Sequence, residues 1–416
     1  MKPSYNVDVD VLRESPTRAV NRVVERLKRE GKDVIMLSTG EPGIPPPLEV
    51  RLWLSEALKE DSMRLYSYTP SPGFLSLREA IVDDLKELGG VDVSVDQVVV
   101  ATGGQATMFS TLATILSPGD EVILMDPTYF GYWNLLSYFK AEPKPIVASL
   151  DKGFQPGVEA IKESIVKGKT RAIIMVSPDN PTGRLLDFDV ARSLAEIAVD
   201  YGLWIVYDEP YKTLIYEGEH VYMYNLAPEN TISLNAFSKD PGIPGWRLGY
   251  IYGPAWVMKK IALASEAITY NPPSVAQHLV TVYLRNRELR RRHIEYAKRI
   301  YMERRDVMVE EVSKIEGAKY VKPGGAMFLM VDMKEVLEPL KVDCTLLAER
   351  LLREKLVALL PGEFFGKSTK TFIRLSFPTE TPERIREGIR RLGELLEEMG
   401  KESLGKKESS LFEASL

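Results

Sequence analysis

The chain has 416 residues, which is long for one domain and enough for two, so it can bury a large core and still form a cleft. It carries 54 Lys and Arg against 59 Asp and Glu, a formal net charge of −5, with no basic block that could follow a phosphate backbone. This balance argues against nucleic acid as a partner.

Cysteine, histidine and apolar residues are distributed as in a cytoplasmic protein without a structural metal. Cys344 is the single cysteine, so no intrachain disulfide can form, and the three histidines (His220, His278 and His293) lack the spacing of metal ligands. No apolar run approaches the length of a membrane span, and the opening MKPSYNVDVDVLRESP contains no apolar core followed by a cleavage site. We therefore expect cytoplasmic localisation, no signal peptide and no contact with a membrane.

From about residue 95, short apolar runs alternate with segments of helical period. The apolar runs are QVVVATG, EVILMD, KPIVASL, RAIIMVSP, LWIVYDEP and TISLNAFS, and the helical segments cover 105–117, 129–139, 156–168 and 187–201. RLGYIYG at 247–253 adds a seventh short strand. This alternation predicts an α/β fold in which a mostly parallel, seven-stranded sheet is covered by helices on both faces.

The rest of the chain predicts a smaller α+β domain. A helix over 255–268 is followed by a helical pattern from about 275 to about 314, which would lead out of the sheet domain. GGAMFLMVDM and TFIRLSF then have the pattern of strands between helices. We divide the chain into an N-terminal arm that also contributes to the small domain (1–50), a large domain (51–300), a small C-terminal domain (301–400) and a polar, mobile tail (401–416).

Ligands of open α/β sheets bind beyond the carboxyl ends of the strands, so the residues that follow each apolar run are the candidates for a site. VVVATGGQAT ends in Gly103 and Gly104 and leads into a helix, whose backbone N–H groups and positive end would face an anion such as phosphate. A plain tight turn is an equal alternative for this stretch alone. A dinucleotide-binding loop is disfavoured because the Gly-x-Gly-x-x-Gly pattern is absent.

Three further strand ends carry polar groups. IIMVSPDNPTG brings Asn180, WIVYDEPY brings Asp208 and Tyr211, and SLNAFSKD brings Lys239. Each is weak evidence alone, because Asn-Pro is common in turns, Asp-Glu-Pro can cap a following segment, and lysine is usually solvated. Together with Arg247, they are expected to bring an amide, a carboxylate, a phenol and two cations to one edge of the sheet.

Pyridoxal 5'-phosphate fits this set group by group. Its phosphate needs the helix N-terminus and Arg247, its ring nitrogen needs the carboxylate of Asp208, and its aldehyde needs the amine of Lys239 for a Schiff base. Its phenolic oxygen needs hydrogen-bond donors, which Asn180 and Tyr211 can supply. The strand ends therefore predict a site for this cofactor.

With these residues the chain resembles the class I and II aminotransferases of fold type I, the aspartate-aminotransferase-like enzymes that use pyridoxal phosphate. The resemblance covers roughly residues 15 to 400. It rests on NPTG at 180–183, DEPY at 208–211 and SKDPGIPGWRLGY at 238–250, which match in type, order and spacing. It implies an aminotransferase that acts in amino-acid metabolism.

The resemblance also implies roles at the cofactor site. Lys239 looks like the lysine that holds the cofactor as an internal aldimine and moves the proton between the substrate α-carbon and C4' of the cofactor. Asp208 looks like the partner of the pyridine nitrogen, and Asn180 and Tyr211 look like the partners of the phenolic oxygen. The phosphate site would contain Gly103, Gly104, Gln105, Ser238 and Arg247.

Tyr129 and Tyr68 match two aromatic positions of the family. Tyr129, in DPTYFGY, falls where the family places a ring stacked on the cofactor, with a core aromatic as the alternative. Tyr68, in SYTPSPG, falls where the family reaches across a dimer interface to the phosphate of the other subunit. The resemblance thus implies a homodimer with shared active sites.

Arg374 and Gly40 match the positions that bind substrate in the family. Arg374, in TFIRLSF, resembles the arginine that grips the α-carboxylate with two hydrogen bonds, and Asn180 is assigned to the same substrate site. Gly40, in LSTGEP, resembles the glycine whose backbone lies beside that carboxylate. A solvated arginine on an edge strand is the alternative. Loops near 12–20, 40–47 and 270–274 and the other subunit would form the side-chain pocket, in which no residue indicates the preferred amino acid.

Three positions depart from the family pattern. Ala236, three residues before the lysine, stands where a hydroxyl is frequent, so one phosphate contact is expected to be missing. Pro210 should stiffen the turn that carries Tyr211. Gln105 stands where one subgroup of aspartate enzymes has a lysine that reads the distal carboxylate, which puts aspartate specificity in doubt.

We expect a ping-pong aminotransferase that moves an amino group between an L-amino acid and a 2-oxo acid, with 2-oxoglutarate and glutamate as one pair. Burial and nearby cations should lower the pKa of Lys239, so that it can act as a base. The alternatives are a pyridoxal-phosphate-dependent lyase, β-eliminating or ring-forming, on the same fold, a regulatory binding module, and a nicotinamide-dependent oxidoreductase. The module is disfavoured because no room is left for a helix-turn-helix domain, and the oxidoreductase because the glycine fingerprint is absent.

Overall fold

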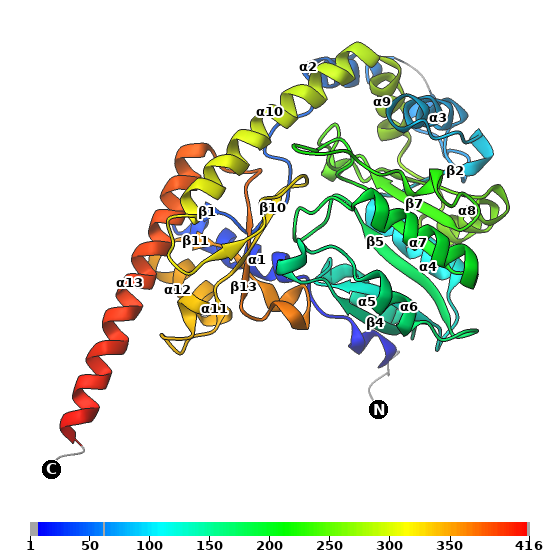
Figure 1. Ribbon diagram of the computed structural model, residues 1–416. Coiled ribbons are helices and arrows are strands. Elements are labelled where there is room, and N and C mark those ends of the chain that lie inside the picture. Colours follow the sequence, from blue (N-terminus) through cyan, green and yellow to red (C-terminus); the bar gives the residue numbers. More distant parts are fainter. Residues whose placement is uncertain (1–6, 61–62, 414–416) are drawn as a thin grey trace, which may run out of the picture.

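A sheet of seven strands forms the core of the larger part of the computed structural model, which describes residues 7–60 and 63–413 (Figure 1, right). The strands are β2 (Val98–Ala101), β3 (Glu121–Asp126), β4 (Glu142–Val147), β5 (Thr170–Val176), β6 (Trp204–Asp208), β7 (Thr231–Ala236) and β8 (Gly249–Tyr252), in the order β2-β8-β7-β6-β5-β3-β4. All neighbours from β7 to β4 are parallel, whereas β8 is antiparallel to both β2 and β7. The predicted α/β fold with a mostly parallel seven-stranded sheet is therefore confirmed.

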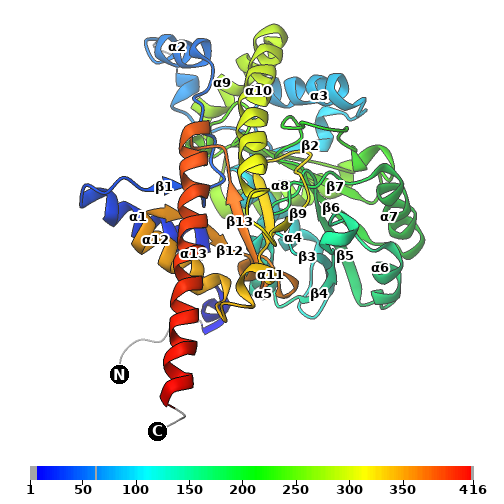
Figure 2. The ribbon, with the colours of Figure 1, turned by 60° about the vertical axis from the view of Figure 1, so that its left-hand side comes forward.

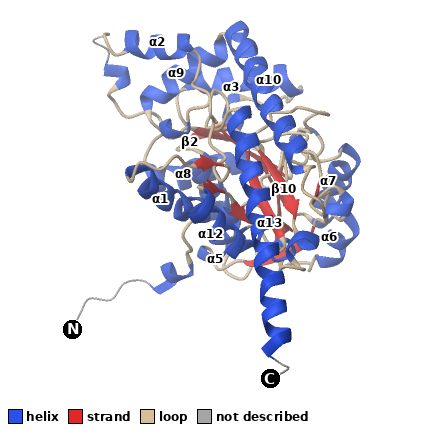
Figure 3. Cartoon of the chain, turned by 90° about the vertical axis from the view of Figure 1, so that its left-hand side faces the viewer, coloured by secondary structure: helices blue, strands red, loops and turns tan. Residues whose placement is uncertain are grey.

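Strand β3 illustrates why these segments lie between two layers of helices. Its Val122 and Leu124 belong to one apolar cluster and its Ile123 and Met125 to another. Because successive side chains of a strand point to opposite faces, a run that is apolar at every position must be covered on both sides. Figure 3 shows helices around the strands. The main covering helices are α4 (Gly104–Ile115), α5 (Phe130–Tyr138), α6 (Val158–Ser164), α7 (Phe188–Tyr201) and α8 (Ala255–Thr269).

The helical pattern predicted from about 275 to 314 is two helices, α9 (Ser274–Arg285) and α10 (Arg287–Val312). They meet at Asn286, whose backbone is not helical (φ −91°, ψ 77°) and whose side chain accepts a hydrogen bond from the N–H of Leu289 at 3.1 Å. Asparagine is a strong N-cap, so the prediction of one continuous pattern was wrong here. Helix α9 packs against α2 (Leu48–Ala57) and α3 (Leu75–Gly89), whereas α10 runs beside α13 (Pro382–Glu413) (Figure 2).

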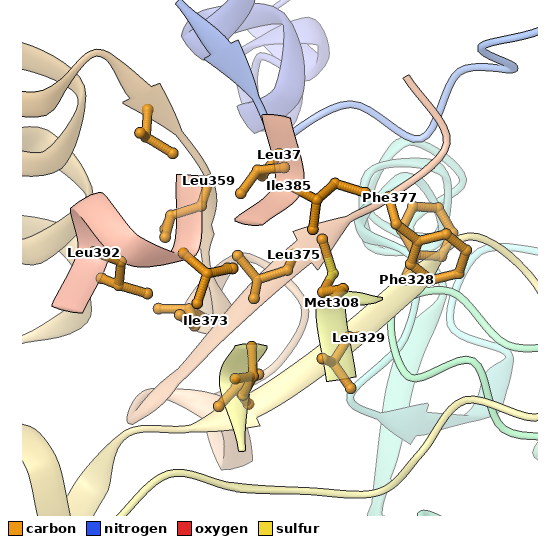
Figure 4. Packing of buried hydrophobic residues seen from close by; sticks show 14 of the residues in the cluster. Leu37, Met308, Phe328, Leu329, Leu359, Ile373, Leu375, Phe377, Ile385 and Leu392 are labelled. Carbon is orange, nitrogen blue, oxygen red and sulfur yellow. The ribbon is translucent and has the colours of Figure 1, made fainter. Parts of the chain in front are cut away.

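A smaller α+β part is built from both ends of the chain, as predicted. An antiparallel sheet contains, in order, β12 (Leu360–Pro361), β13 (Phe372–Ser376), β10 (Phe328–Asp332) and β9 (Lys319–Tyr320). β1 (Ile35–Met36) pairs in parallel with β11 (Val357–Ala358), which joins the N-terminal segment to the C-terminal one. Leu37, Met308, Leu329 and Leu375 pack in the core of this part (Figure 4). Its helices are α1 (Pro16–Arg29), α11 (Lys334–Leu337), α12 (Cys344–Lys355), α13 and the C-terminal half of α10, which carries Met308.

Helix α13 extends into the predicted polar tail. Residues 401–413 continue this helix, while 414–416 lie outside the described residues (Figure 2). None of the helices in the described part of the chain combines the length and the apolarity needed to cross a membrane. Within residues 7–60 and 63–413, no group of three or more His, Cys, Asp or Glu side chains could hold a metal ion.

Candidate active site

A cavity of about 410 Å³ opens at the carboxyl ends of three sheet strands, and Val176 of β5, Asp208 of β6 and Ala236 of β7 line it. Phe328 of β10 and Arg374 of β13 close it from the small α+β part. Most of the residues predicted for ligand binding line this one cavity, namely Gly40, Gly104, Gln105, Tyr129, Asn180, Asp208, Tyr211, Ser238, Lys239, Arg247 and Arg374.

Gly103 and Tyr68 are the predicted residues that do not line the cavity. Gly103 precedes α4 with φ 80°, and a Cβ atom at this position would lie 2.5 Å from Nη2 of Arg247. Glycine is therefore required where the helix N-terminus approaches this arginine. Tyr68 is 82 % exposed, and its ring packs edge-on against Tyr270 with centroids 5.0 Å apart. Its role in the site of a second subunit remains a prediction.

Lys239 lies just beyond the end of β7, and its Nζ donates a hydrogen bond to the carbonyl oxygen of Gly40 at 2.5 Å. Burial lowers the pKa of Lys239 to about 8; the carboxylate of Glu41 opposes this change and the cation of Arg374 adds to it. A large fraction of the amine is thus neutral near pH 8, as a proton acceptor requires.

Asp208 is the last residue of β6, and its Oδ2 accepts a hydrogen bond from the hydroxyl of Tyr132 at 2.6 Å. Burial raises the pKa of Asp208 to about 7, against the lowering effect of this hydrogen bond. No lysine or arginine in the described part of the chain pairs with it, so a cationic ligand atom would offset the cost of its charge. Tyr132 was not predicted, although it lies one helical turn after Tyr129 and therefore on the same side.

Glu209, the residue after Asp208, anchors the turn at the end of β6 through its buried side chain. Its carboxylate is fully buried, accepts a hydrogen bond from the hydroxyl of Tyr252 at 2.9 Å and lies 2.9 Å from Nε2 of His220. Burial alone would raise the pKa of Glu209, but Lys212 and His220 bring it below its ordinary value. An ionised, fully bonded carboxylate behind the strand end makes this turn a rigid support.

Arg374 on β13 is 3 % exposed, which excludes a solvated edge arginine. Its Nη1 donates to Oδ1 of Asn180 at 3.1 Å and its Nη2 donates to the carbonyl oxygen of Ser38 at 2.5 Å. Its Cζ lies 4.5 Å from the ring centroid of Phe328 and 4.7 Å from that of Phe365. Burial lowers the pKa of Arg374 to about 10, so it remains charged at neutral pH. A buried guanidinium between two rings is suited to binding a carboxylate.

A tight loop presents Asn180 to this arginine. The buried carboxylate of Asp179 accepts hydrogen bonds from the N–H of Thr182 at 3.2 Å and from its hydroxyl at 2.5 Å. Gly183 has φ 72°, and a Cβ atom there would lie 2.5 Å from Cβ of Pro323. In the Asn-Pro-Thr-Gly motif, the glycine is thus needed for the backbone of the loop, and the asparagine supplies the side chain that contacts Arg374.

Ser238, Arg247 and the N-terminus of α4 line one corner of the cavity. Arg247 has φ 53°, and its Nη1 donates to the carbonyl oxygen of Pro244 at 2.8 Å. Within residues 7–60 and 63–413, neither its Nη2 nor the hydroxyl of Ser238 has a hydrogen-bond partner. Unused donors beside a helix N-terminus suit a phosphate group. The methyl group of Ala236 lies next to Gly104 here, so position 236 adds no donor.

The N-terminal arm supplies further lining residues that no motif indicated. Two of the three expected pocket loops, 12–20 and 40–47, contribute to the cavity, whereas none of residues 270–274 lines it in this chain. Arg18 is exposed and forms no ion pair with any described residue. The additional residues are Ser15, Thr17, Arg18 and Glu41 from these two segments and Asn21 just after the first.

In a comparison with known protein families, residues 32–392, which are most of the chain, match the family described as aminotransferase class I and II. The chain is 33 % identical to the aspartate/prephenate aminotransferase of Thermus thermophilus over 388 residues, or 93 % of this chain and 97 % of that relative. It is 33 % identical to the aspartate aminotransferase of Pyrococcus horikoshii, over 91 % of this chain and 95 % of that relative. The solved structure of aspartate aminotransferase from Thermus thermophilus with maleate has a TM-score of 0.89 at 32 % identity, covering 94 % of this chain and 100 % of that one.

Proposed function

Since the chain belongs to the class I and II aminotransferases, a family of pyridoxal-phosphate-dependent enzymes, we propose that it moves an amino group between an L-amino acid and a 2-oxo acid by a ping-pong mechanism. One observation carries the proposal: Lys239, Asp208 and Arg374 line the same cavity. They supply an amine of lowered pKa, a carboxyl group without a cationic partner among the described residues, and a buried guanidinium.

The chemistry of the donor set fits pyridoxal 5'-phosphate. Asp208 can hold a protonated ring nitrogen, and the corner formed by Ser238, Arg247 and α4 can bind a phosphate. In the described chain, neither the hydroxyl of Tyr211 nor Nδ2 of Asn180 has a hydrogen-bond partner, so both can donate to the phenolic oxygen. When bound, this cofactor supplies an aldehyde that condenses with amines and a ring that withdraws electrons from the α-carbon.

The protein residues orient the substrate and move the proton in the proposed reaction. Arg374 and Asn180 bind the α-carboxylate, which directs the α-hydrogen toward Lys239. The neutral amine of Lys239 would accept this proton and, with the cofactor bound, would carry it to C4'. Asp208, in its ionised form, would hold the protonated ring nitrogen. The 2-oxo acid leaves before the second 2-oxo acid binds to the same residues, which is the basis of ping-pong kinetics.

We propose 2-oxoglutarate and glutamate as one of the two substrate pairs. Arg18, an exposed cation at the cavity without an ion-pair partner among the described residues, supports an acceptor with a second acidic group, whereas Gln105 supplies no charge. A panel of amino donors assayed with 2-oxoglutarate and with pyruvate tests this choice. Transfer to pyruvate alone, unaffected by Arg18→Ala, would rule out the acidic acceptor.

We also propose a homodimer with shared active sites. Tyr68 contacts Tyr270, and the hydroxyl of Ser71 donates to the carbonyl oxygen of Ala262 at 3.4 Å, so segments 63–71 and 262–270 are adjacent. They expose apolar surface that a second copy would cover. Mixing Lys239→Ala and Tyr68→Ala chains should restore activity, because one site of each mixed dimer is intact. A monomeric mass in sedimentation would contradict the proposal. The large apolar and aromatic side chains of these two segments that are more than half exposed are Met63, Tyr66, Tyr68, Leu263 and Tyr270.

Borohydride reduction tests the proposed function directly. The purified protein should absorb visible light, lose this band on reduction and carry the label on Lys239, whereas a folded Lys239→Ala variant should be colourless. Adding an amino acid alone should release one equivalent of its 2-oxo acid per site. A label on another lysine would overturn the proposal, and release of pyruvate and ammonia without amino transfer would indicate a lyase.

A further inference from the structure

Asp126, the last residue of β3, makes a cluster of contacts that the proposed reaction does not use. The residue is 4 % exposed and does not line the cavity. Its Oδ1 accepts a hydrogen bond from the hydroxyl of Ser368 at 2.6 Å, and its Oδ2 accepts one from the N–H of Lys367 at 3.1 Å. The N–H of Ser368 also points to this carboxylate, 3.2 Å from Oδ1. One side chain of the large sheet thus binds the loop over residues 362–369.

The same loop carries the ring that backs Arg374. Phe365 is 1 % exposed, and its carbonyl oxygen accepts a hydrogen bond from the N–H of Thr128 at 2.8 Å. A Cβ atom at Gly366 would collide with Oδ1 of Asp126, so the loop can approach the carboxylate only with glycine at this position. The contacts of this loop with Asp126 and Thr128 therefore determine how close the ring of Phe365 lies to the guanidinium of Arg374.

Asp126 is also connected to the cofactor side of the cavity. Tyr129, three residues further along the chain, lines the cavity together with Arg374. Movement of the 362–369 loop relative to β3 would change the distance between these two residues, because Arg374 is packed against Phe365 on one side and Phe328 on the other. The hydrogen bonds of Asp126 oppose that movement.

We propose that Asp126 is a positioning residue for substrate binding: through Phe365 it fixes Arg374 at the place where the α-carboxylate binds. The inference rests on the proposed function, because it assigns the α-carboxylate to Arg374. Asp126 contacts neither substrate nor cofactor in this scheme. It should therefore act on the binding of carboxylates and leave cofactor retention unchanged.

Asp126→Asn in the holoenzyme provides the test. The amide has one acceptor in place of two and turns an N–H group toward the backbone N–H groups of Lys367 and Ser368. The Kd for maleate, read from the visible band without turnover, should rise about tenfold, as should KM for the amino donor, with kcat within about twofold. Phe365→Leu should give the same effect, and the double variant should add little because both act through one contact.

Asp343→Asn is the matched control, because Oδ1 of Asp343 accepts a backbone hydrogen bond from Leu346 at 2.7 Å in the same small α+β part. It should lower the melting temperature and leave the Kd for maleate unchanged. If Asp126→Asn does not fold, Ser368→Ala removes a single bond and should still raise this Kd. A wild-type Kd in the folded Asp126 or Ser368 variant would overturn the inference alone. Failure of the wild-type protein to bind maleate or to release a 2-oxo acid would instead count against the proposed function.

Discussion

Nη1 of Arg374 lies 3.1 Å from Oδ1 of Asn180, although the two residues are 194 positions apart in the sequence. Strand β13 carries the arginine and the loop after β5 carries the asparagine, so this contact joins the small α+β part to the large sheet at the cavity. A carboxylate bound by Arg374 would occupy a position that both parts determine.

Replacing Arg374 with lysine should reduce kcat/KM without loss of the cofactor. Lysine keeps the charge but cannot form the planar pair of hydrogen bonds, and the loss of such a buried contact costs about 2–5 kcal/mol, or roughly 30- to 5,000-fold. Steady-state kinetics of Arg374→Lys, with the visible band recorded in parallel, would measure this. Arg384→Lys, at an ion pair outside the cavity, is the control and should leave kcat/KM unchanged.

The pKa of Lys239 should govern how fast cofactor-free protein captures pyridoxal phosphate. Only the neutral amine attacks the aldehyde, so the capture rate should rise with pH through about 8 and then level off. Stopped-flow measurement of the visible band between pH 6.5 and 10.5 gives this profile. Glu41→Gln should move the midpoint lower, because Glu41 raises the pKa of Lys239. A rate that still climbs steeply at pH 10 would show an ordinary lysine.

Asp208→Asn should stabilise the cofactor-free protein at pH 8 while weakening cofactor binding. The folded-state pKa of Asp208 is raised to about 7, so its contribution to stability is fully present below about pH 4 and is lost as the pH rises through 7. The ionised carboxylate therefore costs on the order of 4 kcal/mol at pH 8, which the amide avoids. The stability curves of the two cofactor-free proteins, from thermal unfolding between pH 4 and 8.5, should diverge progressively from about pH 4 to about pH 7 and stay a constant distance apart above it; curves that are parallel throughout would contradict the assignment.

A hydroxyl introduced at position 236 should tighten cofactor binding. Ala236 lies beside Gly104 in the proposed phosphate corner, where a hydrogen bond to a charged group contributes about 1.5–3 kcal/mol. Ala236→Thr and Ala236→Val have nearly the same shape, so their comparison isolates the hydroxyl. The Kd for pyridoxal phosphate should be roughly 10- to 100-fold lower for the threonine variant. Equal values would show that the phosphate does not lie in this corner.

Replacing Arg290 should reduce the stability of the fold more than replacing an exposed arginine. It is 8 % exposed and pairs with the buried carboxylate of Asp84 and, at 3.0 Å, with Asp240, the residue after Lys239. Arg290→Met leaves the buried carboxylate of Asp84 and the partly buried carboxylate of Asp240 without this cation, which should lower the free energy of unfolding by about 3–5 kcal/mol in urea titrations. Arg291→Met on the same helix removes an exposed ion pair with Glu288 and should cost less than about 1 kcal/mol.

The central strands were predictable because their apolar residues are continuous. A run such as TRAIIMV in β5 can be buried on both faces only as a central strand or a fully buried helix, and its length favours the strand. Helices α2 and α3, which begin after Pro47 and Phe74, were not predicted. Local sequence signals thus located the sheet and the helices α4 to α8 that cover it, but not α2 and α3.

Two prediction errors concern residues whose amino-acid type is compatible with more than one structural role. Asn286 lies between two segments of helical composition, and its capping hydrogen bond, which ends one helix and begins the next, depends on the backbone angles. Tyr132 has the composition of a core aromatic and is fully buried, yet it donates to Asp208. In both cases the side chain's partner, and not its polarity, determines its role.

The sequence by itself determined which polar groups meet at the cavity, because parallel strands bring their carboxyl ends, and hence Asn180, Asp208 and Lys239, to one edge of the sheet. Only the tertiary structure decided how these groups behave. The pKa values of Lys239 and Asp208 are shifted mainly by burial, which depends on everything packed around them. The contact of Phe365 with Arg374 and the bonds from Asp126 to its loop likewise join residues far apart in the chain, and no local spacing encodes such long-range contacts.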